Sequence, residues 1–206
     1  MNGEQTAAWI RRAAEVVAAD ADRLTRLDAA IGDGDHGLNL DRGFTAAVAA
    51  LPEGAPPGKT LIAAGRAIVS KTGGASGPLY GTALRRAGKA LGDAEDVDAA
   101  ALGAALRAAL EGVQELGQAV EGDKTMVDAL TPAVAAYEAA VPGGDIAACA
   151  RAAADAAEKG AEATVPMQAR KGRASYLGAR SVGHLDPGAA STVLILRALS
   201  DVTEGK

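Results

Sequence analysis

The stretch Asp28-Ala-Ala-Ile-Gly-Asp-Gly-Asp-His-Gly-Leu-Asn39 differs from the alanine-rich sequence on either side of it. It places three carboxylates, three glycines and one of the two histidines within twelve residues. Asp33 and Asp35 flank a glycine, so both can point inward from a tight loop, and Asp28 lies at the expected end of a helix. Such close carboxylates repel one another unless a cation lies between them, and oxygen ligands on a flexible turn suit Mg²⁺ or Ca²⁺ rather than Zn²⁺. The stretch therefore predicts a metal site.

Two familiar motifs fit this stretch only in part. Gly32–Gly37 spells G-x-G-x-x-G, the pattern of a dinucleotide-binding fold. However, the preceding segment 24–30 has helical spacing rather than a strand, and the two aspartates inside the motif would repel a pyrophosphate. An EF-hand calcium loop would need a ligand, a glycine and a glutamate where Gly37, Leu38 and Phe44 stand. A solvated acidic turn remains the simplest alternative from these residues alone.

Composition favours closely packed helices. The chain has 206 residues and is 49% hydrophobic but only 2% aromatic, so small residues must fill its core. The net charge of −5 argues against nucleic acid and anionic membranes as partners, which need a basic face. An anionic ligand remains compatible if a metal and a few placed cations hold it.

Targeting signals are not evident in the sequence. No apolar run approaches the roughly 20 residues of a membrane span, and the first residues lack the apolar segment of a signal peptide. The single cysteine, Cys149, excludes an intramolecular disulfide framework, and its alanine-rich surroundings predict a buried position on a helix. We therefore expect a cytoplasmic protein that does not associate with membranes.

Apolar spacing near 3.6 residues predicts helices throughout and no strand. Thr125 is expected to cap one of them, with Asp128 as the reciprocal acid of a capping box. We expect a single all-α domain over residues 1–206, an antiparallel bundle of eight helices. The expected helices are 5–27, 37–51, 59–71, 79–91, 97–116, 125–140, 145–164 and 189–199.

Two glycine-containing turns raise the question of phosphate binding. Gly54–Thr60 has one spacer residue too few for a P-loop, no strand before it, and prolines where N–H donors are needed, so it predicts a helix start instead. Gly73-Gly-Ala-Ser76 precedes a helix whose first turn contains Pro78, an arrangement that suits an anion. From the residues alone, an ordinary interhelix turn is equally compatible.

The order of the loops predicts where they meet. In an up-and-down bundle, the loops after the first, third, fifth and seventh helices lie at the same end. These are the acidic stretch, the Gly73–Ser76 turn, the loop 117–124 and the basic loop 170–188. A metal site, a phosphate cradle and a basic loop at one mouth favour a nucleotide bound with its metal.

These segments resemble the nucleotide-binding L subunit of dihydroxyacetone kinase, and the resemblance spans essentially the whole chain. The similar motifs are Asp28–Gly37, Gly73–Gly81, Gly122–Asp128, Lys171–Gly178 and His184–Ala189. The resemblance implies an eight-helix antiparallel barrel and phosphoryl transfer from ATP with Mg²⁺. Leu38 departs from the smaller or hydroxyl residue expected at its position in many relatives.

The resemblance also implies a role for particular residues. Asp28, Asp33 and Asp35 would hold two Mg²⁺ ions, and His36 would act in catalysis. Ala75 and Ser76 would wrap the phosphates, Gly117 and Met126 would line the adenine pocket, and Arg173 with the Asp186-Pro187-Gly188 turn would close the site. The implied nucleotide-binding set is His36, Gly37, Leu38, Asn39, Ala75, Ser76, Gly117, Met126, Arg173, Asp186, Pro187 and Gly188.

The same resemblance implies partners. Dihydroxyacetone would be held by a separate K subunit, and a phosphohistidine-carrying M subunit of a phosphotransferase system would recharge bound ADP. The alternatives are a subunit that exchanges ATP and acts on another triose or tetrose, and a nucleotide-dependent regulatory module without catalysis. A homodimer and a transcription factor as partner are also compatible with the resemblance. His184 is expected to be structural.

Overall fold

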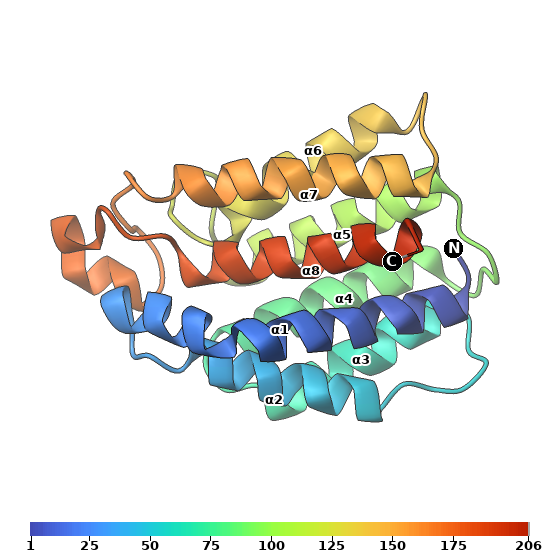
Figure 1. Ribbon diagram of the computed structural model, residues 1–206, viewed down its shortest axis with the longest axis horizontal. Helices are drawn as coiled ribbons and strands as arrows, with labels where there is room; N and C mark the ends of the chain where they lie inside the picture. Colours follow the sequence, from blue (N-terminus) through green and yellow to red (C-terminus); the bar gives the residue numbers. More distant parts are fainter. Residues whose placement is uncertain (206) are drawn as a thin grey trace.

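The computed structural model describes residues 1–205, which form helices joined by short loops (Figure 1). Within that range no strand forms, and Asn2 and Asp96 make only an isolated bridge. The all-α prediction is therefore confirmed. The elements are α1 (Gly3–Ile31), α2 (His36–Ala49), α3 (Pro57–Lys71), α4 (Ser76–Leu91), α5 (Ala99–Gly117), α6 (Met126–Ala140), α7 (Ile146–Ala163), the 3-10 helix η1 (Arg173–Ser181) and α8 (Pro187–Thr203).

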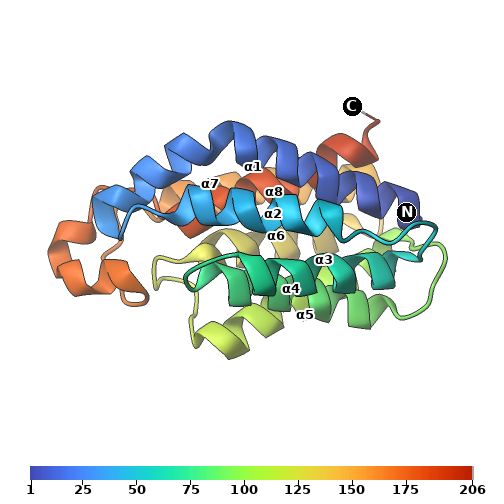
Figure 2. The same ribbon diagram turned by 90° about the horizontal axis from the view of Figure 1, so that it is seen from below.

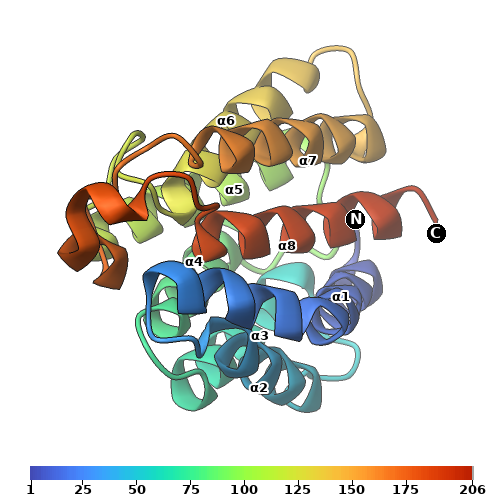
Figure 3. The ribbon, with the colours of Figure 1, turned by 60° about the vertical axis from the view of Figure 1, so that its left-hand side comes forward.

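The eight α-helices form a closed antiparallel ring. Each helix packs against the next one in the chain, and α8 contacts both α7 and α1, which closes the ring. Figure 3 shows α8 between these two neighbours. The predicted eight-helix antiparallel barrel is confirmed.

Small residues allow the helices to approach closely, as the low aromatic content predicts. A Cβ atom on Gly37 would lie 1.9 Å from the carbonyl oxygen of Ala21, so α2 crosses α1 where only glycine fits. The α1–α8 contact has a specific hydrogen bond, because Trp9 Nε1 donates to the Ile195 carbonyl at 2.9 Å in the core. Cys149 is fully buried on α7, as predicted.

The predicted cap of α6 forms, whereas α1 runs beyond its predicted end at residue 27. Thr125 caps α6, accepting from the Val127 N–H, while the Thr125 N–H donates to Asp128 at 2.7 Å, so the predicted capping box forms. Helix α1 continues to Ile31, which puts Asp28 in its last turn.

The segment 170–188, predicted as a loop, contains the additional helix η1. This part of the prediction was wrong, because a 3-10 helix interrupted by Gly178 at φ 57° has no 3.6-residue pattern to read. Helix η1, orange in Figure 1, lies at the end of the bundle opposite the two termini. Figure 2, turned by 90°, shows the same arrangement of the two ends. In the described part of the chain, none of the helices has the length and apolar character to span a membrane.

Candidate functional site

A cavity of about 300 Å³ opens at the end of the barrel that carries η1. Its wall includes residues from the loops α1–α2, α3–α4, α5–α6 and α7–α8, so the predicted meeting of these four loops is confirmed. The volume lies at the lower end of the range found for small-molecule sites. The cavity has an acidic side, a side formed by helix N-termini and an apolar side.

The acidic side consists of Asp28, Asp33 and Asp35. One carboxylate oxygen from each lies within 4.8 Å of those of the other two. Gly34, at φ 72°, makes the turn that places Asp33 and Asp35 on either side of it. These carboxylates also stand at the C-terminal end of α1, where the helix dipole favours positive charge. Three hard oxygen donors at this spacing fit Mg²⁺ or Ca²⁺.

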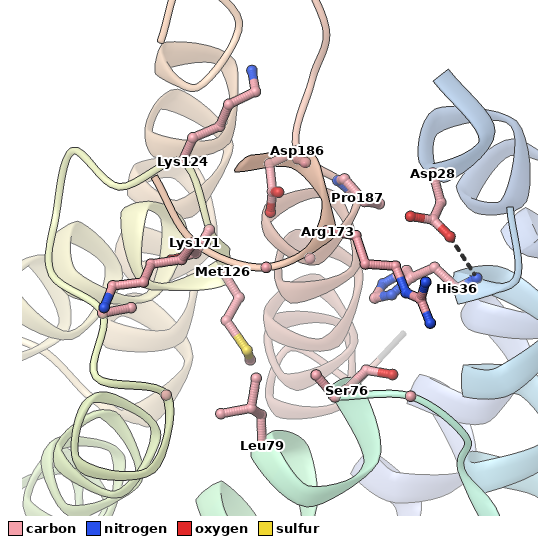
Figure 4. Close-up of a pocket in the computed structure, with 18 of the residues that line it drawn as sticks. Asp28, His36, Ser76, Leu79, Lys124, Met126, Lys171, Arg173, Asp186 and Pro187 are labelled. Atoms are coloured by element: carbon pink, nitrogen blue, oxygen red, sulfur yellow. Dashed lines mark hydrogen bonds between the residues drawn. The ribbon is translucent and has the colours of Figure 1, made fainter. Parts of the chain in front are cut away.

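Asp28 has a second role in the same loop. Its Oδ2 accepts the backbone N–H groups of Asp35 at 2.9 Å and His36 at 3.2 Å, the latter bond visible in Figure 4. The side chain is 9% exposed, so these bonds form in a partly dry environment. Asp28 therefore shapes the loop that carries the other two carboxylates, and its Oδ1 remains available for a cation.

A basic residue crosses the mouth of the cavity. Arg173 Nε lies 3.0 Å from Asp33 Oδ2, and this ion pair links η1 to the α1–α2 loop. The Arg173 side chain is 69% exposed, so the pair contributes little to the free energy of unfolding. Its position matters more, because the guanidinium stands beside the metal-ligand cluster and at the entrance of the cavity.

Four helix N-termini face the cavity. The even-numbered helices all begin at this end of the barrel, so the positive ends of their dipoles converge there. Helix α4 begins at Ser76 without a side-chain cap, which leaves N–H groups of its first turn for a ligand. Gly74 adopts φ 66°, and a Cβ on Gly73 would lie 2.7 Å from Asn39 Oδ1, so this turn requires both glycines. The geometry suits a phosphate.

The opposite side of the cavity is apolar. Leu79 and Met126 lie there in Figure 4, across from Asp28 and His36. Gly117 contributes by being small, since a Cβ there would lie 3.3 Å from Leu79 Cδ2. A planar apolar group such as a nucleobase fits this side. Further apolar residues of the wall include Ile31, Val113, Ala119 and Val127.

His36 begins α2 and packs toward α8. Its Nε2 lies 2.9 Å from Ser191 Oγ. Burial lowers the pKa of His36, and the nearby carboxylates of Asp28 and Asp35 oppose that shift. The ring is therefore neutral at pH 7, and its orientation is fixed by the helix that follows the Asp186-Pro187-Gly188 turn.

Tyr80 extends this polar network into the core. Its hydroxyl lies 2.7 Å from Ser191 Oγ and 3.0 Å from Thr192 Oγ1. The same hydroxyl is placed to donate to the Gly188 carbonyl oxygen, 3.1 Å away. Burial raises the pKa of Tyr80 to about 12, so the group stays a neutral hydroxyl. Tyr80 on α4 and His36 on α2 thus hold the start of α8 from two sides.

Asp186 caps α8 at the wall of the cavity. Its Oδ2 accepts the Ala189 N–H at 2.7 Å, and the side chain is 8% exposed. Burial raises the pKa of Asp186 to about 7, against the opposing effects of the Ala189 bond and the Lys124 charge. In Figure 4 its carboxylate points toward the interior of the site.

Most of the predicted site residues line the cavity, and three do not. The predicted residues in the wall are Asp28, Asp33, Asp35, His36, Ala75, Ser76, Gly117, Met126, Arg173, Asp186, Pro187 and Gly188. Gly37 is buried against α1, Leu38 is 57% exposed, and Asn39 supports the Gly73 turn while accepting from Arg42 at 2.6 Å. Contact of these three residues with a nucleotide stays a prediction. His184 is exposed and outside the wall.

The structure adds residues that sequence reasoning missed. Leu79, Tyr80, Lys124 and Lys171 also line the cavity. Each lies within one of the motifs Gly73–Gly81, Gly122–Asp128 and Lys171–Gly178, so the motifs indicated the right segments but not these individual residues. Their side chains give no sign of a site when read singly.

A helical barrel with a carboxylate cluster, an uncapped helix N-terminus and an apolar side at one mouth is an arrangement that suits a nucleotide bound with its metal. The family model for the DAK2 domain matches residues 30–201, and the chain belongs to this family.

Similar proteins cover nearly the full chain. It is 42% identical over 193 residues to the PEP-dependent dihydroxyacetone kinase 1, ADP-binding subunit DhaL, of Listeria innocua, covering 93% of this chain and 92% of that protein. It is 40% identical over 195 residues to the corresponding ADP-binding subunit of Escherichia coli, covering 93% of each. The D-erythrulose kinase of Mycolicibacterium smegmatis is 42% identical over 193 residues, which are 91% of this chain but 33% of that protein.

A solved structure has the same fold. The dihydroxyacetone kinase from C. freundii in complex with AMP-PNP and Mg²⁺ superposes with a TM-score of 0.72 at 27% sequence identity. The match covers 95% of this chain and 33% of that chain, so this chain spans about a third of that kinase.

Proposed function

We propose that this chain is the nucleotide-binding subunit of a dihydroxyacetone kinase. It holds ADP or ATP with Mg²⁺ at the mouth of the barrel and passes the γ-phosphoryl group to dihydroxyacetone on a separate K subunit. The observation that carries the proposal is the three-sided cavity, in which carboxylates, helix N-termini and an apolar slot meet. The names of its relatives, ADP-binding subunits of this kinase, support the same reading. We also infer that residues 1–206 act as one domain.

The three carboxylates would hold two Mg²⁺ ions. Each of the three residues offers a carboxylate oxygen, Asp28 through Oδ1, and water and phosphate oxygens would complete the coordination. Bound Mg²⁺ would neutralise charge on the nucleotide phosphates. The chain itself supplies orientation, through the N-terminus of α4 and the Gly73–Ser76 turn.

His36 is proposed to act at the phosphates, within a fixed frame. Because Ser191 on α8 hydrogen-bonds to its ring, the position of His36 is coupled to that of α8. Arg173 is placed to exchange its Asp33 partner for a phosphate oxygen, which would draw η1 over the mouth. Together these groups would exclude water and align the phosphoryl group with its acceptor.

The rim of the mouth is proposed to contact the K subunit. Segments at this end of the barrel carry exposed apolar side chains, and a K subunit carrying the acceptor must approach this end for direct transfer. The exposed large apolar residues are Leu38, Val69, Leu116, Val120, Tyr176 and Val182. A homodimer and a transcription-factor partner stay predictions.

The test of the proposal is a phosphorylation assay with purified components. The chain with ATP and Mg²⁺ should not phosphorylate dihydroxyacetone alone but should do so when a K subunit from a DhaL-containing system is added. Erythrulose in place of dihydroxyacetone tests the alternative acceptor. Turnover without a K subunit, or none with any compatible K subunit, would contradict the split kinase.

The phosphoryl source is tested separately, on freshly purified protein without added nucleotide. The proposal that an M subunit recharges the bound coenzyme predicts near-stoichiometric ADP, released by denaturation and identified by mass. An empty protein that takes up ATP with Mg²⁺ would instead support an ATP-exchanging subunit.

A further inference from the structure

Lys124 is a buried lysine whose charge faces no carboxylate directly. The residue is 1% exposed, and Nζ donates to the Thr164 carbonyl at 2.6 Å and to the His184 carbonyl. Burial lowers the pKa of Lys124, and the carboxylates of Asp186 and Asp128 oppose that shift. Burying an ammonium group costs free energy that two backbone acceptors offset only in part. Because a buried lysine lowers the stability of the fold, its presence here indicates a functional role.

The lysine joins three segments of the cavity wall. It immediately precedes Thr125, the cap of α6, and it has a left-handed φ of 62°, which is uncommon for a residue other than glycine. Its two acceptors belong to the end of α7 and to the residue two positions before Asp186. In Figure 4 its side chain extends away from Met126, and the two residues that accept from Nζ, Thr164 and His184, are not among those that line the cavity.

Thr164 completes the same junction. Its Oγ1 accepts the Asp186 N–H at 3.0 Å and donates to the Ala161 carbonyl at 2.6 Å, both in the interior. The two segments held by this junction touch at the cavity, since a Cβ on Gly188 would lie 3.4 Å from Met126 Cβ. The distance between the apolar side of the cavity and the Asp186–Gly188 turn therefore depends on the hydrogen bonds that Lys124 and Thr164 make.

We propose that Lys124 is a positioning residue for the nucleotide. Its buried ammonium fixes the Asp186-Pro187-Gly188 turn against the start of α6, so that the base-binding and phosphate-binding sides keep the spacing that one nucleotide requires. This role rests on the proposed nucleotide function. The metal ligands lie on α1 and the α1–α2 loop, and the hydrogen bonds of Lys124 and Thr164 go to other segments.

The test compares Lys124→Met, which keeps the stem without the charge, with Lys124→Arg, which keeps a cation. Each is titrated with ADP in saturating Mg²⁺ by calorimetry and, separately, with Mn²⁺ alone by electron paramagnetic resonance. Lys124→Met should raise the Kd for ADP by at least about tenfold, since two buried carbonyls lose their donor. The Kd for Mn²⁺ should stay unchanged, and Lys124→Arg should recover part of the ADP affinity.

A matched control separates positioning from general destabilisation. Leu102→Ala removes a buried side chain near the start of α5, outside the cavity wall, and should lower the free energy of unfolding without changing either Kd. If Lys124→Met does not fold, Thr164→Val removes the Asp186 N–H acceptor from the same junction, and should weaken ADP but not Mn²⁺.

The outcomes distinguish two failures. Folded Lys124→Met that binds ADP as tightly as the wild type overturns the role of Lys124 alone, as does unchanged ADP binding by Thr164→Val. A wild-type chain that binds no ADP with Mg²⁺ overturns the nucleotide site together with this role.

Discussion

At the scale of single residues, the ion pair between Arg173 and Asp33 lies where a metal ion and a nucleotide phosphate would bind next to each other. The guanidinium is 3.0 Å from a carboxylate of the proposed metal site. A cation bound there competes with Arg173 for Asp33, whereas nucleotide phosphates offer Arg173 a new partner. The same residue therefore opposes the binding of metal alone and favours the binding of metal with nucleotide.

Arg173→Gln should separate these effects. Without the guanidinium, Mn²⁺ alone should bind up to about threefold more tightly, because the exposed ion pair that it displaces is weak. ADP with Mg²⁺ should bind more weakly, because a charged phosphate contact is lost. Both are measured by titration of the stripped protein, and Arg180→Gln, on the same helix but outside the cavity wall, is the control. Changes of the same sign in both titrations would argue against the exchange of partners.

The raised pKa of Asp186 makes the free energy of unfolding depend on pH. Burial raises its pKa from the ordinary value of 3.8 to about 7, so the folded protein keeps a proton that the unfolded chain has lost. Between these pH values the folded state binds more protons, and this group makes the free energy of unfolding fall as the pH rises. Asp186→Asn retains an oxygen for the helix cap and cannot ionise.

The variant should accordingly be more stable than the wild type at pH 8, with a smaller difference at pH 5. Urea unfolding at the two pH values measures this, without nucleotide or metal. An equal difference at the two pH values, with the wild type the more stable, would show that Asp186 is ionised and stabilising in the fold.

At the scale of elements, the turn before α4 depends on a left-handed glycine. Gly74 has φ 66° and Gly54, in the α2–α3 loop at the other end of the barrel, has φ 62° with no atom near its absent Cβ. Alanine at either position carries a similar backbone strain of about 1–2 kcal/mol. The two glycines differ only in what lies next to them.

Gly74→Ala and Gly54→Ala should therefore destabilise the protein to a similar extent, but only Gly74→Ala should weaken ADP binding in Mg²⁺. Chemical unfolding and calorimetry on both variants provide the comparison. Equal ADP affinity in the two variants would remove the Gly73–Ser76 turn from the phosphate site.

The elements also show what the sequence could predict. Helices with strong apolar spacing, and the meeting of alternate loops at one end, followed from periodicity and connectivity, and the Thr125 capping box was identified residue by residue. Helix η1 escaped prediction because it is short, polar and broken at Gly178. Lys124 escaped because its role depends on carbonyls 40 and 60 residues away, which no local pattern reveals.

At the scale of the whole molecule, the cavity lies at the C-terminal end of α1, and the Trp9–Ile195 hydrogen bond lies toward the N-terminal end of that helix. Trp9, the single tryptophan, is near the start of α1 and reports on that distant contact through its bond to Ile195. If the barrel unfolds as one unit, a ligand bound at the mouth stabilises the region around Trp9 as well.

Tryptophan fluorescence should follow a single unfolding transition that ADP with Mg²⁺ shifts. A free ADP concentration of 100 times Kd should add about 2.7 kcal/mol to the free energy of unfolding. Circular dichroism should give a coincident transition. A Trp9 transition that ligand leaves in place would show that the two ends of the barrel unfold independently.

The central claim, a metal-dependent nucleotide site at the mouth of the barrel, is tested most directly by calorimetric titration of the stripped wild-type chain with ADP, in Mg²⁺ and in EDTA. We expect one ADP per chain in Mg²⁺, much weaker binding in EDTA, and the same loss when Asp33→Ala is titrated in Mg²⁺ with its helix content unchanged. Equal affinity in Mg²⁺ and EDTA, undiminished binding by Asp33→Ala, or no binding by the wild type would contradict the site described by these residues.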